Sequence, residues 1–303
     1  MGKAHGQKSH AVKKSKSEPF IYCLNTSTIR GQKLPLTEEI DLAAKAGFSA
    51  IEPWISEVED HVKAGGTTKE LRKRIKEHGM TVESAIGFAE WIVDDNDRRR
   101  KGMEQAKRDL DLISQVGAKR IAAPAAGAAD VSNIDLMKAA ERYRALQDLA
   151  DQFGIVAQVE VWGFSKTLTT LSSAAFVAIQ SGHPKACILT DVYHLYKGGS
   201  DFNGLKLLSS DALEVIHMND YPAAPTRSRI NDSHRVYPGD GIAPMDEILH
   251  TLLDIGYNGA LSVELFNPTY YKQDAYSVVK TSLDKTRAVV KHATSTYKRS
   301  KDT

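Results

Sequence analysis

Residues 151–159 read DQFGIVAQV, which combines a helix-like end, a glycine and a short apolar run. Five further stretches repeat this order, namely AKAGFSAIE (44–52), KEHGMTVES (76–84), SQVGAKRIA (114–122), IQSGHPKACIL (179–189) and LDIGYNGALSV (253–263). A glycine just beyond a helix takes up the left-handed conformation at low cost. Each stretch is therefore predicted to join the end of a helix to the start of a strand.

The segments before these glycines have the period of an amphipathic helix, as Met103, Ala106 and Leu110 illustrate. Short apolar runs predict strands at 20–24, 50–54, 81–86, 120–123, 156–161, 186–190, 213–218 and 260–265. Eight strands that alternate with helices predict an α/β fold, a single-domain (β/α)8 TIM barrel over residues 19–298. The rival is a doubly wound open sheet. CLNTSTIRGQ (23–32), after the first strand, lacks the glycine-rich phosphate loop usual in that fold.

The composition is that of a globular protein. Of 303 residues, 42% are hydrophobic and 26% are charged, which excludes disorder of the whole chain. The formal net charge is +2, and residues 1–18 hold a local +4, so the remainder carries about −2. A body with this balance lacks the basic surface that nucleic-acid binding requires. We expect residues 1–18 to be a disordered basic tail and 299–303 to be a short C-terminal tail.

Two cysteines, Cys23 and Cys187, lie within predicted strands. We expect them to be buried free thiols, as suits a reducing compartment. No run approaches 18 apolar residues, and no apolar segment follows the N-terminal lysines. These observations predict a cytoplasmic protein that has neither a membrane nor nucleic acid as a partner. The sequence leaves open whether the chain forms a homo-oligomer.

Four successive predicted strands each carry an ionisable residue to their carboxyl end. The ends VAQVE, CILTD, LEVIH and ALSVE contribute Glu160, Asp191, His217 and Glu264. In a barrel these ends meet at one rim. Burying such groups in apolar strands is costly, and one divalent cation would compensate all four. Three carboxylates and one imidazole suit Mn²⁺ first, with Mg²⁺, Co²⁺ or Zn²⁺ as alternatives.

The order of these motifs resembles the xylose-isomerase-like barrel superfamily of sugar isomerases and epimerases. The motifs that carry the resemblance are Glu160, DVYHL (191–195), HMNDYP (217–222), DSHRVYPGDG (232–241) and LSVELFN (261–267). The resemblance covers about residues 20–295, nearly the whole chain. It implies that the metal ligands are Glu160, Asp191, His217 and Glu264. It also implies that Glu160 and Glu264 transfer protons on opposite faces of the substrate.

The resemblance further implies substrate-binding residues near the metal. His194, three residues after Asp191, would hold substrate oxygens. An arginine that binds substrate in the family is matched by Arg227, Arg229 or Arg235. We choose Arg235 because it lies just before PGDG.

Two kinds of residue at or just beyond strands are weaker candidates. Trp54, Trp91 and Trp162 could present their rings to the apolar C–H face of a sugar. Packing between barrel and helix would explain Trp162 equally well and would explain the other two better. Glu52 could reach the site, but an ion pair at the rim would also explain it, so we leave it outside.

The predicted function is that of a metal-dependent isomerase or epimerase of a small keto-sugar or keto-polyol. A metal that chelates the ketone and its neighbouring hydroxyl makes the α C–H acidic and stabilises the enediolate that forms when a carboxylate removes the proton. No glycine-rich phosphate loop follows the seventh or eighth strand. We therefore expect a polyhydroxylated carbonyl substrate without a phosphate.

Three other functions are weighed against this one. A dehydratase of a keto-cyclitol or a dehydroshikimate-type compound would begin with the same proton removal, and the sequence does not separate it. An abasic-site endonuclease would need further histidines at strand ends for a three-metal cluster. The first four ends offer Asn25, Trp54, Ala85 and Ala123 instead. An intact four-ligand site argues against a barrel that only binds a ligand.

Overall fold

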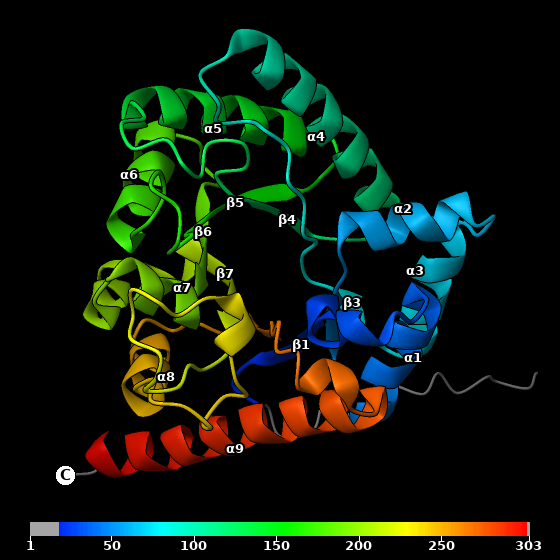
Figure 1. Ribbon diagram of the computed structural model, residues 1–303, viewed down its shortest axis with the longest axis vertical. Helices are drawn as coiled ribbons and strands as arrows, with labels where there is room; N and C mark the ends of the chain where they lie inside the picture. The colour runs from blue at the N-terminus through cyan, green and yellow to red at the C-terminus, as the bar shows by residue number, and fades with distance from the viewer. Residues whose placement is uncertain (1–17, 302–303) are drawn as a thin grey trace, which may run out of the picture.

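The computed structural model describes residues 18–301. Within them, parallel strands lie at the centre and helices surround them (Figure 1). The predicted basic tail at 1–18 lies outside the described residues except for Glu18. The predicted C-terminal tail at 299–303 falls partly on the last helix, α9 (Ala275–Lys301), and partly outside the described residues.

The strands of the described chain form one eight-stranded parallel sheet in the order β3-β2-β1-β8-β7-β6-β5-β4. Their bounds are β1 (Ile21–Asn25), β2 (Ala50–Glu52), β3 (Thr81–Val82), β4 (Arg120–Ala123), β5 (Val156–Glu160), β6 (Cys187–Asp191), β7 (Leu213–Met218) and β8 (Ala260–Val263). The segments at the two ends of this order also bond to each other. The Lys119 amide donates to the Val82 carbonyl at 3.2 Å, and the Ala122 amide donates to the Ala85 carbonyl at 2.9 Å. These bonds bring the edges together, and the predicted (β/α)8 barrel is confirmed.

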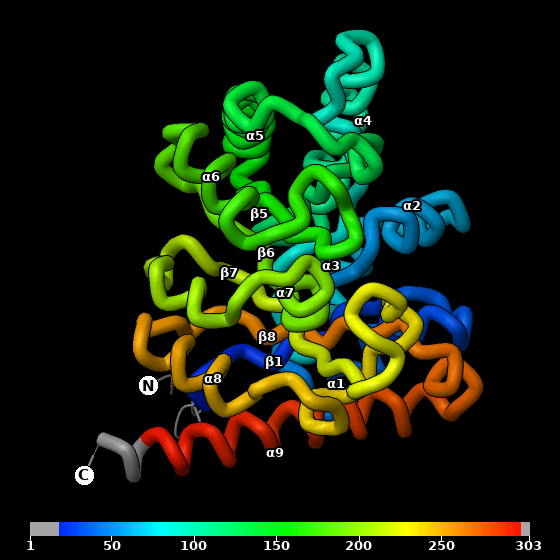
Figure 2. The backbone as a smooth tube through the Cα atoms, turned by 60° about the vertical axis from the view of Figure 1, so that its left-hand side comes forward, coloured from blue at the N-terminus to red at the C-terminus, as the bar shows by residue number. Residues whose placement is uncertain are grey.

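The helices follow the strands along the chain. Their bounds are α1 (Leu36–Ala46), α2 (Ile55–Lys63), α3 (Thr68–Glu77), α4 (Asn96–Val116), α5 (Leu136–Asp151), α6 (Leu171–Ser181), α7 (Val192–Gly198), α8 (Met245–Asp254) and α9. The long helix α9 packs against α8 and α1 along one side of the barrel (Figure 2). The six glycines of the sequence repeat have φ between 62° and 101°, which is the left-handed conformation predicted for them.

The third strand is shorter than the sequence predicted. β3 covers two residues, whereas the prediction extended from 81 to 86. Beyond β3, the Ala85 amide donates to the Arg120 carbonyl on one side, and the Ile86 amide donates to the Pro53 carbonyl on the other. The segment therefore stays within the wall of the barrel while it leaves the regular ladder.

Side chains of two kinds fill the inside of the barrel. An apolar layer consists of Cys23, Ala50, Ile86, Ala122, Leu189, Val215 and Ala260. Because residues two apart on a strand point to the same face, the next layer toward the carboxyl ends is polar. Its members are Asn25, Glu52, Asp191, His217 and Ser262, all buried. In the strand register, Asn25 lies opposite Glu52, and His217 pairs with Asp191 on one side and with Ser262 on the other.

Both cysteines are buried and free, as the sequence predicted. Cys23 belongs to the apolar layer inside the barrel. Among the described helices, none combines the length and the apolar character that a membrane crossing requires.

Candidate metal centre

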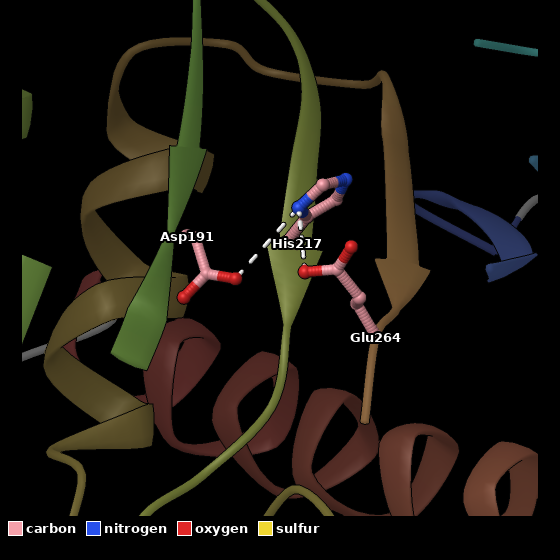
Figure 3. A group of neighbouring side chains, drawn as sticks. All are labelled: Asp191, His217 and Glu264. Atoms are coloured by element: carbon pink, nitrogen blue, oxygen red, sulfur yellow. Dashed lines mark ion pairs between the residues drawn. The ribbon is translucent and has the colours of Figure 1, made fainter. Parts of the chain in front are cut away.

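Three of the four predicted ligands meet at the carboxyl ends of neighbouring strands. Asp191 ends β6, His217 lies on β7 and Glu264 directly follows β8. Each offers one ligand atom, and these atoms lie within 4.8 Å of one another (Figure 3). The His217 Nδ1 atom lies 3.2 Å from Glu264 Oε2 and 3.7 Å from Asp191 Oδ2. We call these three buried residues the metal floor.

The His217 ring is held by a residue that the sequence reasoning left outside the site. Its Nε2 atom lies 3.1 Å from Glu52 Oε2. The same carboxylate oxygen accepts hydrogen bonds from Asn25 Nδ2 at 2.9 Å and from Ser262 Oγ at 2.6 Å. A carboxylate behind a metal-binding histidine fixes its ring orientation and its tautomer. Glu52 therefore points Nδ1 toward Asp191 and Glu264.

The donor set fits a divalent cation. His217 Nδ1 is buried and makes no hydrogen bond to any of the described residues, although two carboxylates lie near it. Burial opposes a charge on the ring, but the carboxylates of Glu264 and Glu52 outweigh burial and raise the pKa of His217. The position therefore attracts positive charge, either a proton or a metal ion.

Arg235 lies against two residues of the metal floor. Its Nη1 atom donates to Asp191 Oδ2 and to Glu264 Oε2, each at 2.8 Å. Its Nη2 atom contacts His194 Nε2 at 3.0 Å and also pairs with Asp232. The side chain is almost completely buried, so these partners hold the guanidinium at the site. Of the three arginines weighed from the sequence, the structure thus brings Arg235 to the metal floor.

His194 reaches the same place from the first turn of α7. Its backbone amide donates to Asp191 Oδ1 at 2.7 Å, and its ring lies beside Arg235. Burial lowers the pKa of His194 more than the charge of Asp191 raises it. Its predicted role in substrate binding stays a prediction.

Glu160, at the end of β5, lines the same cavity as Glu264, but it is not one of the three residues whose ligand atoms gather within 4.8 Å in the described chain. Its role as a metal ligand stays a prediction. Burial raises the pKa of Glu160 to about 8, and the negative charges of Glu264 and Asp191 add to this effect, while His217 opposes it. The pKa of Glu160 is thus raised, whereas His217 and Arg235 lower the pKa of Glu264 in the same cavity.

The cavity over the metal floor has a volume of about 400 Å³. Its polar lining consists of Glu160, His194, Asp232, Ser233, Arg235 and Glu264. Its apolar lining consists of Ile86 and five aromatic residues, Trp54, Phe88, Trp162, Phe164 and Phe266, which we call the aromatic wall. Trp162, predicted to line the pocket, lies among them.

The rings of the aromatic wall form a continuous series. The centroid distances are 5.0 Å between Trp54 and Phe88, 6.1 Å between Phe88 and Trp162, and 5.0 Å between Trp162 and Phe164. Phe266 joins from the other side, 6.2 Å from Trp54. The sequence indicated Trp54 and Trp162 but missed three members, Phe88, Phe164 and Phe266. Their position shortly after predicted strands was the one signal that could have indicated them. Trp91, the third tryptophan considered, is buried outside this lining, where its Nε1–H donates to the Pro124 carbonyl at 2.8 Å.

The PGDG motif has a structural role at this rim. Asp220 Oδ2 accepts the amides of Gly239 and Gly241, each at 3.0 Å, and Oδ1 accepts the amide of Ala243 at 2.9 Å. A Cβ on Gly241 would lie 2.3 Å from Asp220 Oδ1, so only glycine fits. Asp220 thereby fixes the loop that follows Arg235.

Comparison with known proteins agrees with this architecture. The family model described as xylose isomerase-like TIM barrel matches residues 40–289. The chain belongs to this family. An inosose isomerase of Bacillus velezensis is 25% identical to this xylose isomerase-like barrel over 272 residues, which cover 88% of this chain and 96% of that protein.

A 3-dehydroshikimate dehydratase of Pseudomonas putida is 24% identical over 233 residues, which cover 77% of this chain and 36% of that protein. Among solved structures, the IolI protein with a bound zinc atom has a TM-score of 0.84 at 21% identity, covering 90% of this chain and 99% of that one. The xylose isomerase-like barrel thus has enzymes, an isomerase and a dehydratase, among its relatives.

Proposed function

We propose that this protein is a divalent-metal-dependent isomerase or epimerase of a small unphosphorylated keto-sugar or keto-polyol. One observation carries the proposal, the meeting of Asp191, His217 and Glu264 in a buried cluster beside a second carboxyl group, Glu160. The inosose isomerase relative, matched over nearly its full length, supports this class of reaction.

Asp191, His217 and Glu264 would hold the ion, with Glu160 as the proposed fourth ligand. Carboxylates with one imidazole suit Mn²⁺, and the zinc atom of the similar IolI structure supports Zn²⁺ as the alternative. When bound, the ion would supply electrophilic catalysis, because it polarises a carbonyl group and its neighbouring hydroxyl.

The two glutamates are suited to opposite halves of a proton transfer. Burial opposes ionisation of Glu264, but His217 and Arg235 outweigh burial and lower its pKa, so this carboxylate can act as a base. Without a bound cation, burial raises the pKa of Glu160 to about 8. A cation that Glu160 binds would lower this pKa, because carboxylates bind metals in the deprotonated form. We therefore assign the proton transfer to Glu160 and Glu264 as a pair, one removing the α proton and the other delivering a proton, with the roles exchanged in the reverse direction.

Turnover in D2O tests this assignment. Keto-sugars and keto-cyclitols would be incubated with the enzyme and Mn²⁺, and the products analysed by NMR. Deuterium is expected on the carbon whose proton is exchanged, whereas a hydride shift would leave it unlabelled. Glu160→Gln and Glu264→Gln should each reduce kcat by about 10³-fold. Unlabelled product, or normal activity in both variants, would overturn the two-glutamate mechanism.

A dehydratase is the second candidate, and the Pseudomonas putida relative supports it. One of the two glutamates would remove the same proton, and the other could then protonate a departing hydroxyl. The product would be unsaturated and absorb in the ultraviolet. A product that absorbs in the ultraviolet and has lost the mass of water would identify a dehydratase. A product with the same mass as the substrate would identify an isomerase or epimerase.

A further inference from the structure

The cavity presents two unlike sides to a substrate. The polar side chains gather around the metal floor, whereas the aromatic wall and Ile86 supply the rest of the lining. A free keto-sugar carries a hydroxyl on almost every carbon, and each hydroxyl placed against the wall would lose its hydrogen bonds to water without replacement. One ring, such as Trp162, is enough to cover the apolar face of a sugar. Five rings provide more apolar surface than the sugar can use.

Trp54 shows that the wall offers ring surface and not polar groups. Its Nε1–H donates to Asn25 Oδ1 at 3.1 Å, so its one donor is already used. The Arg30 guanidinium lies 3.5 Å from the ring centroid and covers one face of the ring, while Trp54 still lines the cavity. The cation and the asparagine fix the orientation of Trp54 at the edge of the cavity.

Two members of the wall are more than a third exposed. Phe88 is 37% exposed and Phe164 is 47% exposed. They follow β3 and β5, strands that are separated in the sheet, yet both rings contact Trp162. Apolar rings that gather at a cavity mouth while still exposed indicate a surface that a ligand covers.

The charges around the cavity restrict what that ligand can carry. Arg235 is the cation among the described lining residues, and Asp191, Glu264 and Asp232 already pair with it. The remaining ionisable lining residues are acidic, apart from His194, whose Nε2 atom accepts a hydrogen bond from Arg235 Nη2 at 3.0 Å. A phosphate or carboxylate near the wall would thus find no unpaired cation among the lining residues, and the guanidinium of Arg30, which lies outside the lining, is stacked on Trp54.

We propose that the substrate is a keto-sugar bearing an uncharged aromatic substituent, which stacks on the aromatic wall while the keto-sugar ring lies over the metal floor. This inference rests on the proposed function for the reacting half of the substrate. The stacking half rests on Trp54, Phe88, Trp162, Phe164 and Phe266 alone. Offset or tilted stacking on such rings gains both burial and quadrupole attraction.

A matched pair of probes tests the inference by binding, without need of turnover. Phenyl and methyl β-D-glucoside would be titrated into the metal-loaded enzyme by calorimetry, and their 3-keto derivatives would be assayed for turnover. The phenyl compound should bind at least about tenfold more tightly, and its keto derivative should have a correspondingly lower KM. Phe88→Ala and Phe164→Ala should each remove most of this preference, because the affinity for the phenyl compound falls by a larger factor than the affinity for the methyl compound. Phe176→Ala, at a partly exposed phenylalanine of α6 outside the cavity lining, is the control and should change neither.

The outcomes separate the two proposals. Phenyl preference that depends on Phe88 and Phe164, without turnover of any keto compound, would support the aromatic substituent and overturn the proposed function. Turnover with equal affinity for both probes would overturn the substituent and leave the proposed function standing. Binding of neither probe overturns the inference. So does self-association in analytical ultracentrifugation that Phe88→Ala abolishes, because a second copy would then be the occupant of the wall.

Discussion

The metal floor and the aromatic wall line one cavity, but the chain holds them in different ways. Asp191, His217 and Glu264 lie on or directly after neighbouring strands, are buried, and are fixed by strand register and hydrogen bonds. The wall residues follow β2, β3, β5 and β8, and two of them are more than a third exposed. The difference indicates that the barrel fixes the chemistry, whereas the loops select the substrate.

Removing a ligand from the metal floor is the most severe way to test this division. Asp191→Asn and His217→Ala should each abolish metal binding and lower kcat/KM by at least about 10³-fold, because both depend on that cluster. Metal content would be measured by mass spectrometry, with Asp211→Asn, at an exposed aspartate before β7, as the control. Full metal occupancy in both variants would remove the site as we describe it.

Glu52 tests whether a residue that contacts a metal-floor residue, without being a ligand itself, contributes to metal affinity. Glu52→Gln keeps the size of the side chain but weakens its hold on His217 Nε2, and metal affinity should fall by about 10- to 100-fold. Calorimetry with Zn²⁺ and Mn²⁺ measures this. Glu83→Gln is the matched control, because Glu83 is equally buried but pairs with Lys119 and Arg120, so its loss should affect stability and not metal affinity. An unchanged Kd in Glu52→Gln would restrict the floor to its three ligands.

Trp162 belongs to the wall and should respond differently from the floor. Trp162→Ala should raise KM by about tenfold, because the ring binds substrate. It should also lower kcat, though less than the floor variants do, because the Trp162 side chain hydrogen-bonds to Glu160 without itself transferring a proton. Trp162→Phe, which keeps a ring, should restore most of the affinity. Steady-state kinetics on the best substrate of the panel measures both. A large loss of kcat at constant KM would mean that Trp162 acts in the chemical step and not in substrate binding.

The smallest effect on activity is expected at Glu39 of α1, which is outside the cavity lining. Burial raises the pKa of this carboxyl to about 9, the charge of Glu57 adds to the rise, and Arg30, which covers Trp54, opposes it. A folded-state pKa above the unfolded value of 4.5 leaves stability unaffected below about pH 4.5 and lowers it as pH rises toward 9, since the unfolded chain loses its proton first. Glu39→Gln removes this cost.

The variant should therefore be more stable than the parent by a few kcal/mol, roughly, at pH 9 and equal to it at pH 4, with kcat/KM unchanged. Thermal unfolding across this pH range measures the difference. Glu38→Gln, at the exposed neighbouring position, should show no such pH dependence. A constant difference between Glu39→Gln and the parent at all pH values would mean that Glu39 does not titrate as described.

Glu52 and Phe88 show why the site could be predicted only in part. The metal floor was visible in the sequence because each member lies at the end of an apolar strand, where a charged residue is conspicuous. Glu52 also lies at the end of a strand, β2, but its role depends on which atom its carboxylate contacts. Glu52 contacts Asn25, which is 27 positions away in the chain, and the ring of His217, which is 165 positions away. Both contacts join segments that are distant in the sequence.

The sequence by itself determined the alternation of helices and strands, the closure of eight strands into a barrel, and the strand ends that supply Asp191, His217 and Glu264. These features follow from local periodicity, from glycines at helix ends and from the rule that parallel strands share one rim. Only the tertiary structure decided that Arg235 lies against the floor, that Glu52 orients His217, and that five scattered aromatic residues form one wall. The reason is physical: loop conformation and side-chain direction depend on contacts between distant segments, and no local pattern encodes them.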